Sequence, residues 1–310
     1  MKIRYLLVPL ALVLCTQLLS SCVTDNEKIS HPEKIANGEK IATENWRYLL
    51  DKDLSQWNTY LGFPLPETKI SSLPKDAKGN YTQPIGHGKD ERSVFSLSEI
   101  DGEPVLHISG EIYGSIYTQE EFENYHLVLQ FKWGNKKWQP RLDLELDTGV
   151  LYHGVGEHGV DYWKAWPLSQ ELQIIEQGVG DWWQIAGSQI DIRCEKPAGE
   201  KFPMYAPTAK SVAYGSAGAG ITCRRGVDVE KSKGEWNTVE LITYGDKSLH
   251  IVNGVVVMAL SNSHYTRDGK KIPLTKGKIL LQSEAAEVFY KNIKLKSIVA
   301  IPAQYEAYFQ

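Results

Sequence analysis

Cysteine is scarce in this chain, which has four in 310 residues. Cys15 and Cys22 lie in the N-terminal segment, so Cys194 and Cys223 are the pair left for the folded body. Their spacing does not match a zinc knuckle, and we therefore predict no metal site and no cofactor, although a metal requirement stays open. In an exported protein these two thiols would either form a disulfide or remain free and buried, and the sequence does not decide between the two.

Other absences exclude whole classes of function. The chain has no P-loop, no glycine fingerprint for dinucleotides, no Gly-x-Ser-x-Gly elbow and no His-Glu-x-x-His motif. Its formal net charge is −4, and no basic surface is concentrated anywhere along it. Because binding to phosphates requires such a surface, we exclude nucleic acid as a partner.

The N-terminus has the features of an export signal. Lys2 and Arg4 precede an apolar run too short for a membrane span, and Leu19-Ser20-Ser21-Cys22 resembles a bacterial lipobox. This predicts a signal peptide over 1–21 and a lipid on Cys22 that anchors the protein to a membrane of the cell envelope, with the outer membrane expected. An ordinary cleaved signal and a single anchor helix are the alternatives. Residues 22–44 are polar and charged, which predicts a flexible tether.

The remainder predicts an all-β domain over 45–300, followed by a C-terminal tail over 301–310. No segment sustains a helical period, whereas short runs rich in Val, Ile, Leu and Tyr alternate with turn residues, which is typical of an antiparallel sandwich. Asn253-Gly254 favours a type I′ turn that pairs 247–252 with 255–260. The Gly-, Ala- and Pro-rich segment 195–220 predicts a long loop, either functional or a simple excursion. The other predicted strands are 105–110, 125–133, 149–154, 171–176, 236–245, 277–284 and 288–295.

Three of these strands each carry polar residues near one end. A period of two places Glu171 with Gln173, and Gln282 with Glu284, while His153 shares a face with Leu151. Amides, carboxylates and an imidazole suit the binding of a polyhydroxylated ligand and the transfer of a proton. An exposed strand face is the alternative for any one of them.

Aromatic and basic residues near these strands are further candidates for substrate binding. Tyr152, Trp182 and Trp183 would offer apolar platforms for sugar rings, or pack in the core or at its rim. Lys137, Trp138 and Arg141 would line a cleft, although a solvated hairpin tip explains the basic run equally well. His158 lies on a Gly-rich loop and is either solvated or functional.

Six blocks occur in the order of a known family. They are NWRYLLDKDLSQWNTYLG, GEIYGSIYTQEEFENYHLVLQFKWG, DTGVLYHGVG, SQELQIIEQGVGDWW, GEWNTVELITYGDKSLHIVNGVVV and LTKGKILLQSEAAEVFYKNIKL. Over about residues 45–297 the chain resembles the DUF1080 family, the 3-keto-α-glucoside-1,2-lyase/3-keto-2-hydroxyglucal hydratase or 3-keto-disaccharide hydrolase domain. The resemblance implies a concanavalin- or laminin-G-like β-sandwich of the jelly-roll kind, with long loops around a concave face.

The resemblance also implies a reaction. A base removes the C2 proton of a sugar already oxidised to a ketone at C3, the C1 substituent is lost by β-elimination, and water adds to give the free 3-keto sugar. The positions implied are His153 or Glu171 as the base, Gln173 and Gln282 as orienting amides, and Glu176 or Glu284 as an acid or a structural clamp. Leu146 and Leu168 stand where many relatives have arginine, so the chain lacks two arginines that Arg141, Arg224 or Arg225 would have to replace.

We therefore expect an enzyme that cleaves 3-keto-glycosides, with a glycoside or oligosaccharide as its substrate. Two alternatives remain. One is a carbohydrate-binding sandwich without catalysis. The other is a conventional glycoside hydrolase that uses two carboxylates such as Glu171 and Glu284, and it requires a suitable separation between them.

Overall fold

The computed structural model describes residues 45–160, 164–215 and 218–310. The signal peptide, the lipid on Cys22 and the tether, all predicted within 1–44, lie outside the described residues. Within the described part, no helix is long and apolar enough to cross a membrane.

The larger of the two main sheets is antiparallel and twelve-stranded in the described chain. Its strands in spatial order are β12 (Met204–Tyr205), β11 (Ser188–Glu195), β17 (Val255–Arg267), β16 (Lys247–Val252), β15 (Asn237–Tyr244), β7 (Tyr125–Lys137), β20 (Ala286–Ser297), β5 (Glu103–Ile108) and β4 (Phe95–Ile100). Three more strands join it from the side: β1 (Arg47–Tyr48) on β20, β13 (Ser211–Tyr214) on β11 and β18 (Lys270–Pro273) on β17.

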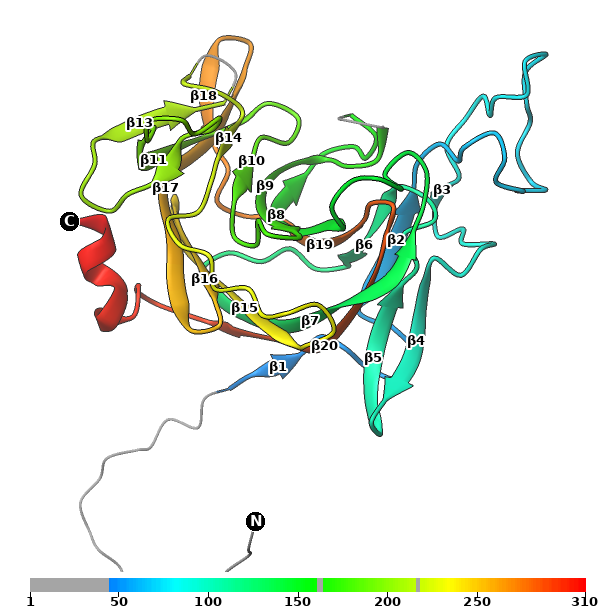
Figure 1. Ribbon diagram of the computed structural model, residues 1–310, viewed down its shortest axis with the longest axis horizontal. Coiled ribbons are helices and arrows are strands. Elements are labelled where there is room, and N and C mark those ends of the chain that lie inside the picture. The colour runs from blue at the N-terminus through cyan, green and yellow to red at the C-terminus, as the bar shows by residue number, and fades with distance from the viewer. Residues whose placement is uncertain (1–44, 161–163, 216–217) are drawn as a thin grey trace, which may run out of the picture. The chain divides into compact units, whose positions relative to one another are not determined.

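The smaller main sheet has six strands and carries the polar residues of interest. In spatial order they are β3 (Gly86–His87), β2 (Trp57–Leu61), β6 (Gly114–Thr118), β19 (Lys278–Ser283), β8 (Asp147–Val155) and β9 (Leu168–Ile175). Figure 1 shows β16, β15, β7 and β20 in one curved layer, and β9, β8 and β19 in the layer that faces it.

The main core fills the space between these two sheets. On β7 the burial alternates, so that Leu127, Leu129 and Phe131 face inward. The facing strands contribute Leu172 from β9 and Leu281 from β19 to the same core. The arrangement is the antiparallel β-sandwich predicted from the sequence, and it turns the opposite face of β8, β9 and β19 away from this core.

The predicted hairpin is confirmed. Val252 of β16 pairs with Val255 of β17. The two turn residues have positive φ angles, 48° at Asn253 and 81° at Gly254, as a type I′ turn requires.

The segment after Gly178 is more regular than its composition predicts. Instead of one long loop over 195–220, it holds β12 and β13, and β10 (Trp182–Trp183) pairs with β14 (Thr222–Cys223) in a small separate sheet. β11 was also missed, because its own alternation Ile190–Ile192 is short, and its pairing with β17, β13 and β12 cannot be read from its own sequence.

The C-terminal residues 303–309 form a short 3-10 helix. Tyr305, Tyr308 and Phe309 pack against a second hydrophobic cluster that lies around β11, β16 and β17. Of the two states open for the cysteines, the structure has the free thiols, with Cys223 buried and Cys194 half-buried. Cys194 Sγ lies 2.8 Å from Tyr214 Oη.

Candidate active site

Three neighbouring strands of the small sheet bring their polar side chains into one pocket. On β8 and β9, Gly149 pairs with Gln173 and Leu151 pairs with Glu171. Because paired residues project from the same face, Glu171, Gln173 and Gln282 lie together, with Glu284 just beyond the end of β19. The pocket has a volume of about 740 Å³. The polar side chains predicted to share a hollow therefore do so on β9 and β19.

Gly149 lies between two of these side chains. A Cβ added to it would come within 2.2 Å of Gln282 Oε1 and 2.8 Å of Glu171 Oε1. The Gln282 amide and the Glu171 carboxyl group therefore both lie directly over the Gly149 backbone. Any residue with a Cβ would clash with them at this position.

Arg141 reaches the pocket from the turn that follows β7. Its backbone N–H donates to the Trp138 carbonyl at 2.9 Å, which closes the turn. Its guanidinium Nη2 lies 2.6 Å from Asp147 Oδ2, and Nη1 lies 3.8 Å from Glu284 Oε1. The guanidinium thus bridges β8 and the end of β19, and it supplies the positive charge beside two carboxyl groups.

Burial changes the protonation of these carboxyl groups. It raises the pKa of Asp147 to about 7, against the opposing effect of the Arg141 charge. Burial raises the pKa of Glu284 well above its usual value, and the negative charges of Asp147 and Glu171 raise it further. Burial therefore favours the protonated form of Glu284, which is the form that can donate a proton.

The pocket also holds many buried polar atoms that make no hydrogen bond to the described residues. These atoms are Arg141 Nε, Asp147 Oδ1, Gln173 Oε1, Trp183 Nε1 and both Gln282 side-chain atoms, and each belongs to a residue that lines the pocket. A buried polar atom without a partner costs roughly 1–3 kcal/mol. Their concentration in one hollow is what a binding site for a hydroxyl-rich ligand provides.

Comparison with known proteins gives the family. A profile described as the 3-keto-alpha-glucoside-1,2-lyase-like domain matches residues 45–296. The chain belongs to this family. The resemblance predicted from the six sequence blocks is confirmed. The lyase-like domain is thus a carbohydrate-active, 3-keto-disaccharide hydrolase-like domain.

Solved structures similar to the lyase-like domain include two provisionally assigned glycosyl hydrolases from Parabacteroides distasonis ATCC 8503. The first is 22% identical, covers 82% of this chain and 99% of its own, and has a TM-score of 0.42. The second is 17% identical, covers 82% of this chain and 94% of its own, and has a TM-score of 0.44. The carbohydrate-binding module CBM66 from Bacillus subtilis is 9% identical, with a TM-score of 0.36 and coverage of 66% and 92%. No protein of curated function matches the chain.

Three predicted site residues of the lyase-like domain lie in its interior instead of in the pocket. His153 has a φ of 54° at a register shift of β8, which turns its ring toward Tyr125 and Tyr152. Its Nδ1 lies 3.1 Å from the Leu274 carbonyl, and burial lowers its pKa to about 4. The prediction that His153 shares the face of Leu151 was therefore wrong, because strict alternation fails at a bulge.

Tyr152 and Trp182 were predicted as sugar platforms, and neither lines the pocket. Tyr152 faces the main core, where its hydroxyl lies 2.9 Å from Ser248 Oγ. Trp182 belongs to the second cluster, and its indole N–H donates to Gln170 Oε1 at 2.8 Å. Trp183, the next residue along the strand, does line the pocket.

Among the basic-turn residues and Glu176, which were also predicted as site residues, one lines the pocket and the others do not. Lys137 donates to the Leu144 carbonyl, and the Trp138 indole donates to the Ser109 carbonyl at 2.8 Å, so of the basic turn only Arg141 lines the pocket. Glu176 lies outside the pocket, where its backbone N–H donates to the Leu146 carbonyl.

Of the three arginines predicted as replacements, Arg141 lines the pocket, whereas Arg224 and Arg225 do not. Arg225 pairs with Asp181 at 3.1 Å, and Arg224 lies within 4 Å of Asp181 and Glu200. Leu146 is buried in the main core and Leu168 is also buried. Among the described residues, Arg141 is therefore the arginine that lines the pocket.

Asp147 was missed as a site residue, although a signal existed. It precedes Gly149 and Leu151 by steps of two, so the same alternation that groups Glu171 with Gln173 places it on the pocket face. No signal of this kind marks Trp166, Phe202 or Ile221, which also line the pocket. In the described part of the chain, no cluster of three or more His, Cys, Asp or Glu side chains is arranged to hold a metal ion.

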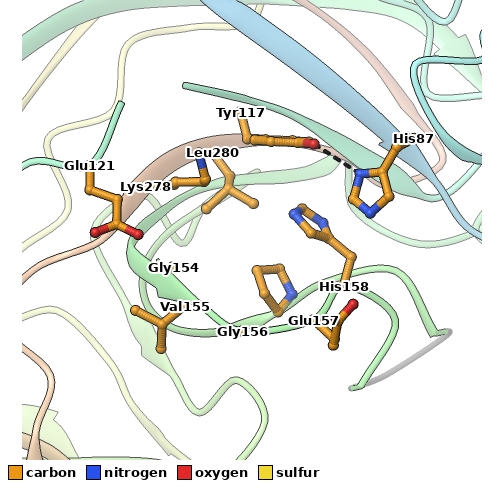
Figure 2. A pocket seen from close by; sticks show the side chains of 11 residues that line it. His87, Tyr117, Glu121, Gly154, Val155, Gly156, Glu157, His158, Lys278 and Leu280 are labelled. Carbon is orange, nitrogen blue, oxygen red and sulfur yellow. Dashed lines mark hydrogen bonds between the residues drawn. The ribbon is translucent and has the colours of Figure 1, made fainter. Parts of the chain in front are cut away.

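A second, smaller pocket of about 200 Å³ lies toward the other end of β19. Figure 2 shows His158 between His87 and Leu280, with Tyr117 hydrogen-bonded to His87 Nδ1 at 2.8 Å. Burial, together with the charges of His87 and Lys278, lowers the pKa of His158 to about 4. His158 was predicted to be either solvated or functional. Its ring is half-buried, so it is not simply solvated, and it lies apart from the carboxyl groups of the main pocket.

Proposed function

We propose that this domain cleaves 3-keto-glycosides by elimination across C1 and C2, followed by hydration. The observation that carries the proposal is that Glu171, Asp147 and Glu284 share one pocket with Arg141, where burial favours the protonated form of Glu284. This set contains a base, a general acid and a fixed positive charge, which are the three groups that the reaction requires.

In the first step, the Glu171 carboxylate takes the proton from C2. The C–H electron pair forms the C2=C3 double bond of an enolate, and the negative charge moves to the C3 oxygen. Amide N–H groups of Gln173 and Gln282 and the Arg141 guanidinium stabilise this charge. Gln282 Nε2 is suited to that role because it makes no hydrogen bond to another described residue.

In the second step, the enolate electrons form the C1=C2 double bond, the C3 ketone is restored and the bond from C1 to the leaving oxygen breaks. Glu284 gives its proton to that oxygen, so the aglycone leaves as a neutral alcohol. Asp147 acts through Arg141, which it holds in place beside Glu284, and is therefore a positioning residue.

Hydration reverses the roles of the two glutamates. The Glu284 carboxylate takes a proton from water as the hydroxyl adds to C1. Glu171, whose proton exchanges with solvent after the aglycone has left, gives a solvent-derived proton to C2. The product is the free 3-keto sugar, and both glutamates regain their starting protonation states. His153 and Glu176, the other two candidates for base and acid, have no part because they lie outside the pocket.

The test is incubation of the protein with a 3-keto-glucoside and with its unoxidised parent in D₂O. Elimination predicts release of the aglycone from the ketone alone, with one deuterium at C2 of the sugar product when it is quenched early. Turnover of the parent would instead indicate two-carboxylate hydrolysis, and binding of both without turnover would indicate a carbohydrate-binding protein. The Glu171→Gln variant serves as the blank for spontaneous exchange at C2.

For the N-terminus, we propose a lipid on Cys22 that holds the protein at a membrane of the cell envelope. The support is the lipobox-like sequence ending at Cys22, preceded by a short apolar run with Lys2 and Arg4 at its start. Cys22→Ala should move the protein from the membrane fraction to the soluble fraction of the cell envelope. Retention of that variant in the membrane fraction would contradict the proposal.

A further inference from the structure

One wall of the main pocket is apolar and comes from segments outside the small sheet. Trp183 belongs to β10, Ile185 follows it, Phe202 precedes β12 and Ile221 precedes β14. The carboxyl groups and amides, in contrast, come from β8, β9 and the end of β19. The pocket thus has a polar side and an apolar side of separate origin.

The apolar wall is held in place by backbone pairing. Trp183 pairs with Thr222, and the Gln184 N–H donates to the Ile221 carbonyl at 2.9 Å, which fixes Ile221 beside Trp183. The rings of Trp183 and Phe202 meet edge to face, with 6.1 Å between their centroids. Such an aromatic pair is a preformed, rigid surface.

Part of this surface is exposed. Ile221 is 57% exposed, and Leu144, which also lines the pocket, is 48% exposed. Large apolar side chains left in water at the mouth of a preformed pocket indicate that a ligand covers them. Burying them stabilises a complex by about 25 cal/mol per Å² of apolar surface removed from water.

The reaction fixes which part of the substrate meets each side. The oxidised sugar must lie at the polar side, where Glu171 and Glu284 act on C2 and on the leaving oxygen. A pocket of about 740 Å³ is in the range that accommodates drug-sized ligands, so it has room for more than one sugar ring. The substituent on C1 therefore extends along the apolar wall.

We propose that the natural leaving group is an apolar ring, as in aryl or alicyclic glycosides, and not a second sugar. This inference rests on the proposed function, because it takes the sugar to lie at the polar side. A hydroxyl group placed against Ile185, Phe202 and Ile221 would lose its hydrogen bonds to water without replacement, whereas an apolar ring loses none. Three polar groups also lie on this wall. Gln184 already donates to the Ser188 carbonyl at 2.9 Å, the Lys201 ammonium lies 4.9 Å from the centroid of the Phe202 ring, and the indole N–H of Trp183 is buried.

The test compares two 3-keto-glucosides whose leaving groups are six-membered rings, cyclohexanol and glucose. We expect kcat/KM to be at least about tenfold higher for the cyclohexyl substrate, the ratio that corresponds to 1.4 kcal/mol. Ile221→Asn should lower that ratio severalfold. Val255→Asn is the matched control, because Val255 is also exposed, at 40%, and lies outside the pocket; it should not change the ratio.

The outcomes separate the two proposals. Equal or faster turnover of the glucosyl substrate would overturn the apolar leaving group and leave the proposed reaction standing. No turnover of either ketone would overturn the proposed reaction. In that case calorimetry with the unoxidised cyclohexyl glucoside and an unoxidised disaccharide decides the inference. Binding of the cyclohexyl compound that is tenfold tighter and weakened by Ile221→Asn supports it, and equal binding overturns it.

Discussion

Arg141 and Asp147 form an ion pair at the edge of the pocket, with 2.6 Å between guanidinium Nη2 and carboxylate Oδ2. Five residues separate them in the sequence, and the turn after β7 folds back so that the two side chains meet. The pair is nearly enclosed, with 15% of the Arg141 side chain and 5% of the Asp147 side chain exposed. Removing one partner would leave the other charge buried, which is costly.

Arg141→Met should raise the pKa of Asp147 above about 7, because the guanidinium charge that lowers it is lost. We also expect kcat/KM to fall about 10²–10³-fold, the range for loss of a group that stabilises an oxyanion. Carbon-detected NMR titration of the Asp147 carboxyl measures the first effect. Arg224→Met is the control, because Arg224 is charged and half-exposed but lies outside the pocket. An unchanged titration of Asp147 would contradict the assignment of the pair.

Glu171→Gln should reduce turnover by roughly 10²–10⁴-fold, since it keeps the shape of the side chain but cannot accept the C2 proton. Glu171 is only 2% exposed, so the close match in size is what should preserve folding. Steady-state kinetics with a 3-keto-glucoside is the measurement. Glu176→Gln makes the same chemical change one residue after β9 and outside the pocket, and it should retain wild-type kinetics. Equal losses in both variants would remove Glu171 as the base.

Gly149→Ala should impair activity although it removes no charged or polar side chain. The added methyl would overlap Gln282 Oε1, which lies 2.2 Å from the position of that Cβ. Gln282 and Glu171 would have to separate, and we expect a loss of about 1–3 kcal/mol in stability from overpacking. Kinetics together with urea unfolding check both effects. Wild-type kcat/KM would show that the contact over Gly149 is not needed for catalysis.

Glu284→Gln should stabilise the protein at alkaline pH while it lowers turnover. The pKa of Glu284 is raised in the folded state, mainly by burial. Its contribution to stability is therefore fully present below the unfolded pKa and is lost as the pH rises toward the folded value. Glutamine does not titrate. The free energy of unfolding of the variant should therefore increase relative to that of the wild type as the pH rises from 5 to 8. A constant difference across this interval, measured by urea unfolding, would mean that Glu284 ionises normally.

His153→Asn should reduce stability by about 1–3 kcal/mol and leave kcat/KM within a few-fold of wild type. The stability loss follows from the buried ring and its contact with the Leu274 carbonyl at 3.1 Å. Asparagine is chosen because it tolerates the φ of 54° at this position. A loss of activity comparable to that of Glu171→Gln would return His153 to the list of candidate bases.

Local pattern was enough to predict the class of fold and much of the site. Alternation of apolar and polar residues is a property of each strand alone, and it grouped Glu171 with Gln173 and Gln282 with Glu284 before any pairing was known. The Asn253-Gly254 turn likewise depends only on its own two residues. The predicted pairing holds next to the turn, at Val252 with Val255, and a register shift between His250 and Ile251 follows. The six sequence blocks gave the family in the same way, from stretches of contiguous sequence.

Local pattern failed where a neighbouring strand decides the geometry. The register shift between Tyr152 and Val155 turns His153 inward, and the stretch LYHG contains no residue pattern that predicts this shift. The segment after Gly178 becomes strands because segments distant in sequence pair with it: β11 pairs with β17, and β10 pairs with β14. Arg141 could not be distinguished from Lys137 by composition, since only the fold of the turn after β7 aims one of them at Asp147.

The sequence by itself determined which side chains β9 and β19 turn away from the core, because that depends on a two-residue period within one strand. Only the tertiary structure decided that three carboxyl groups share one desolvated pocket and that an aromatic wall closes its other side. Those facts depend on register between strands and on burial by distant segments, and both are set by the packing of the whole chain.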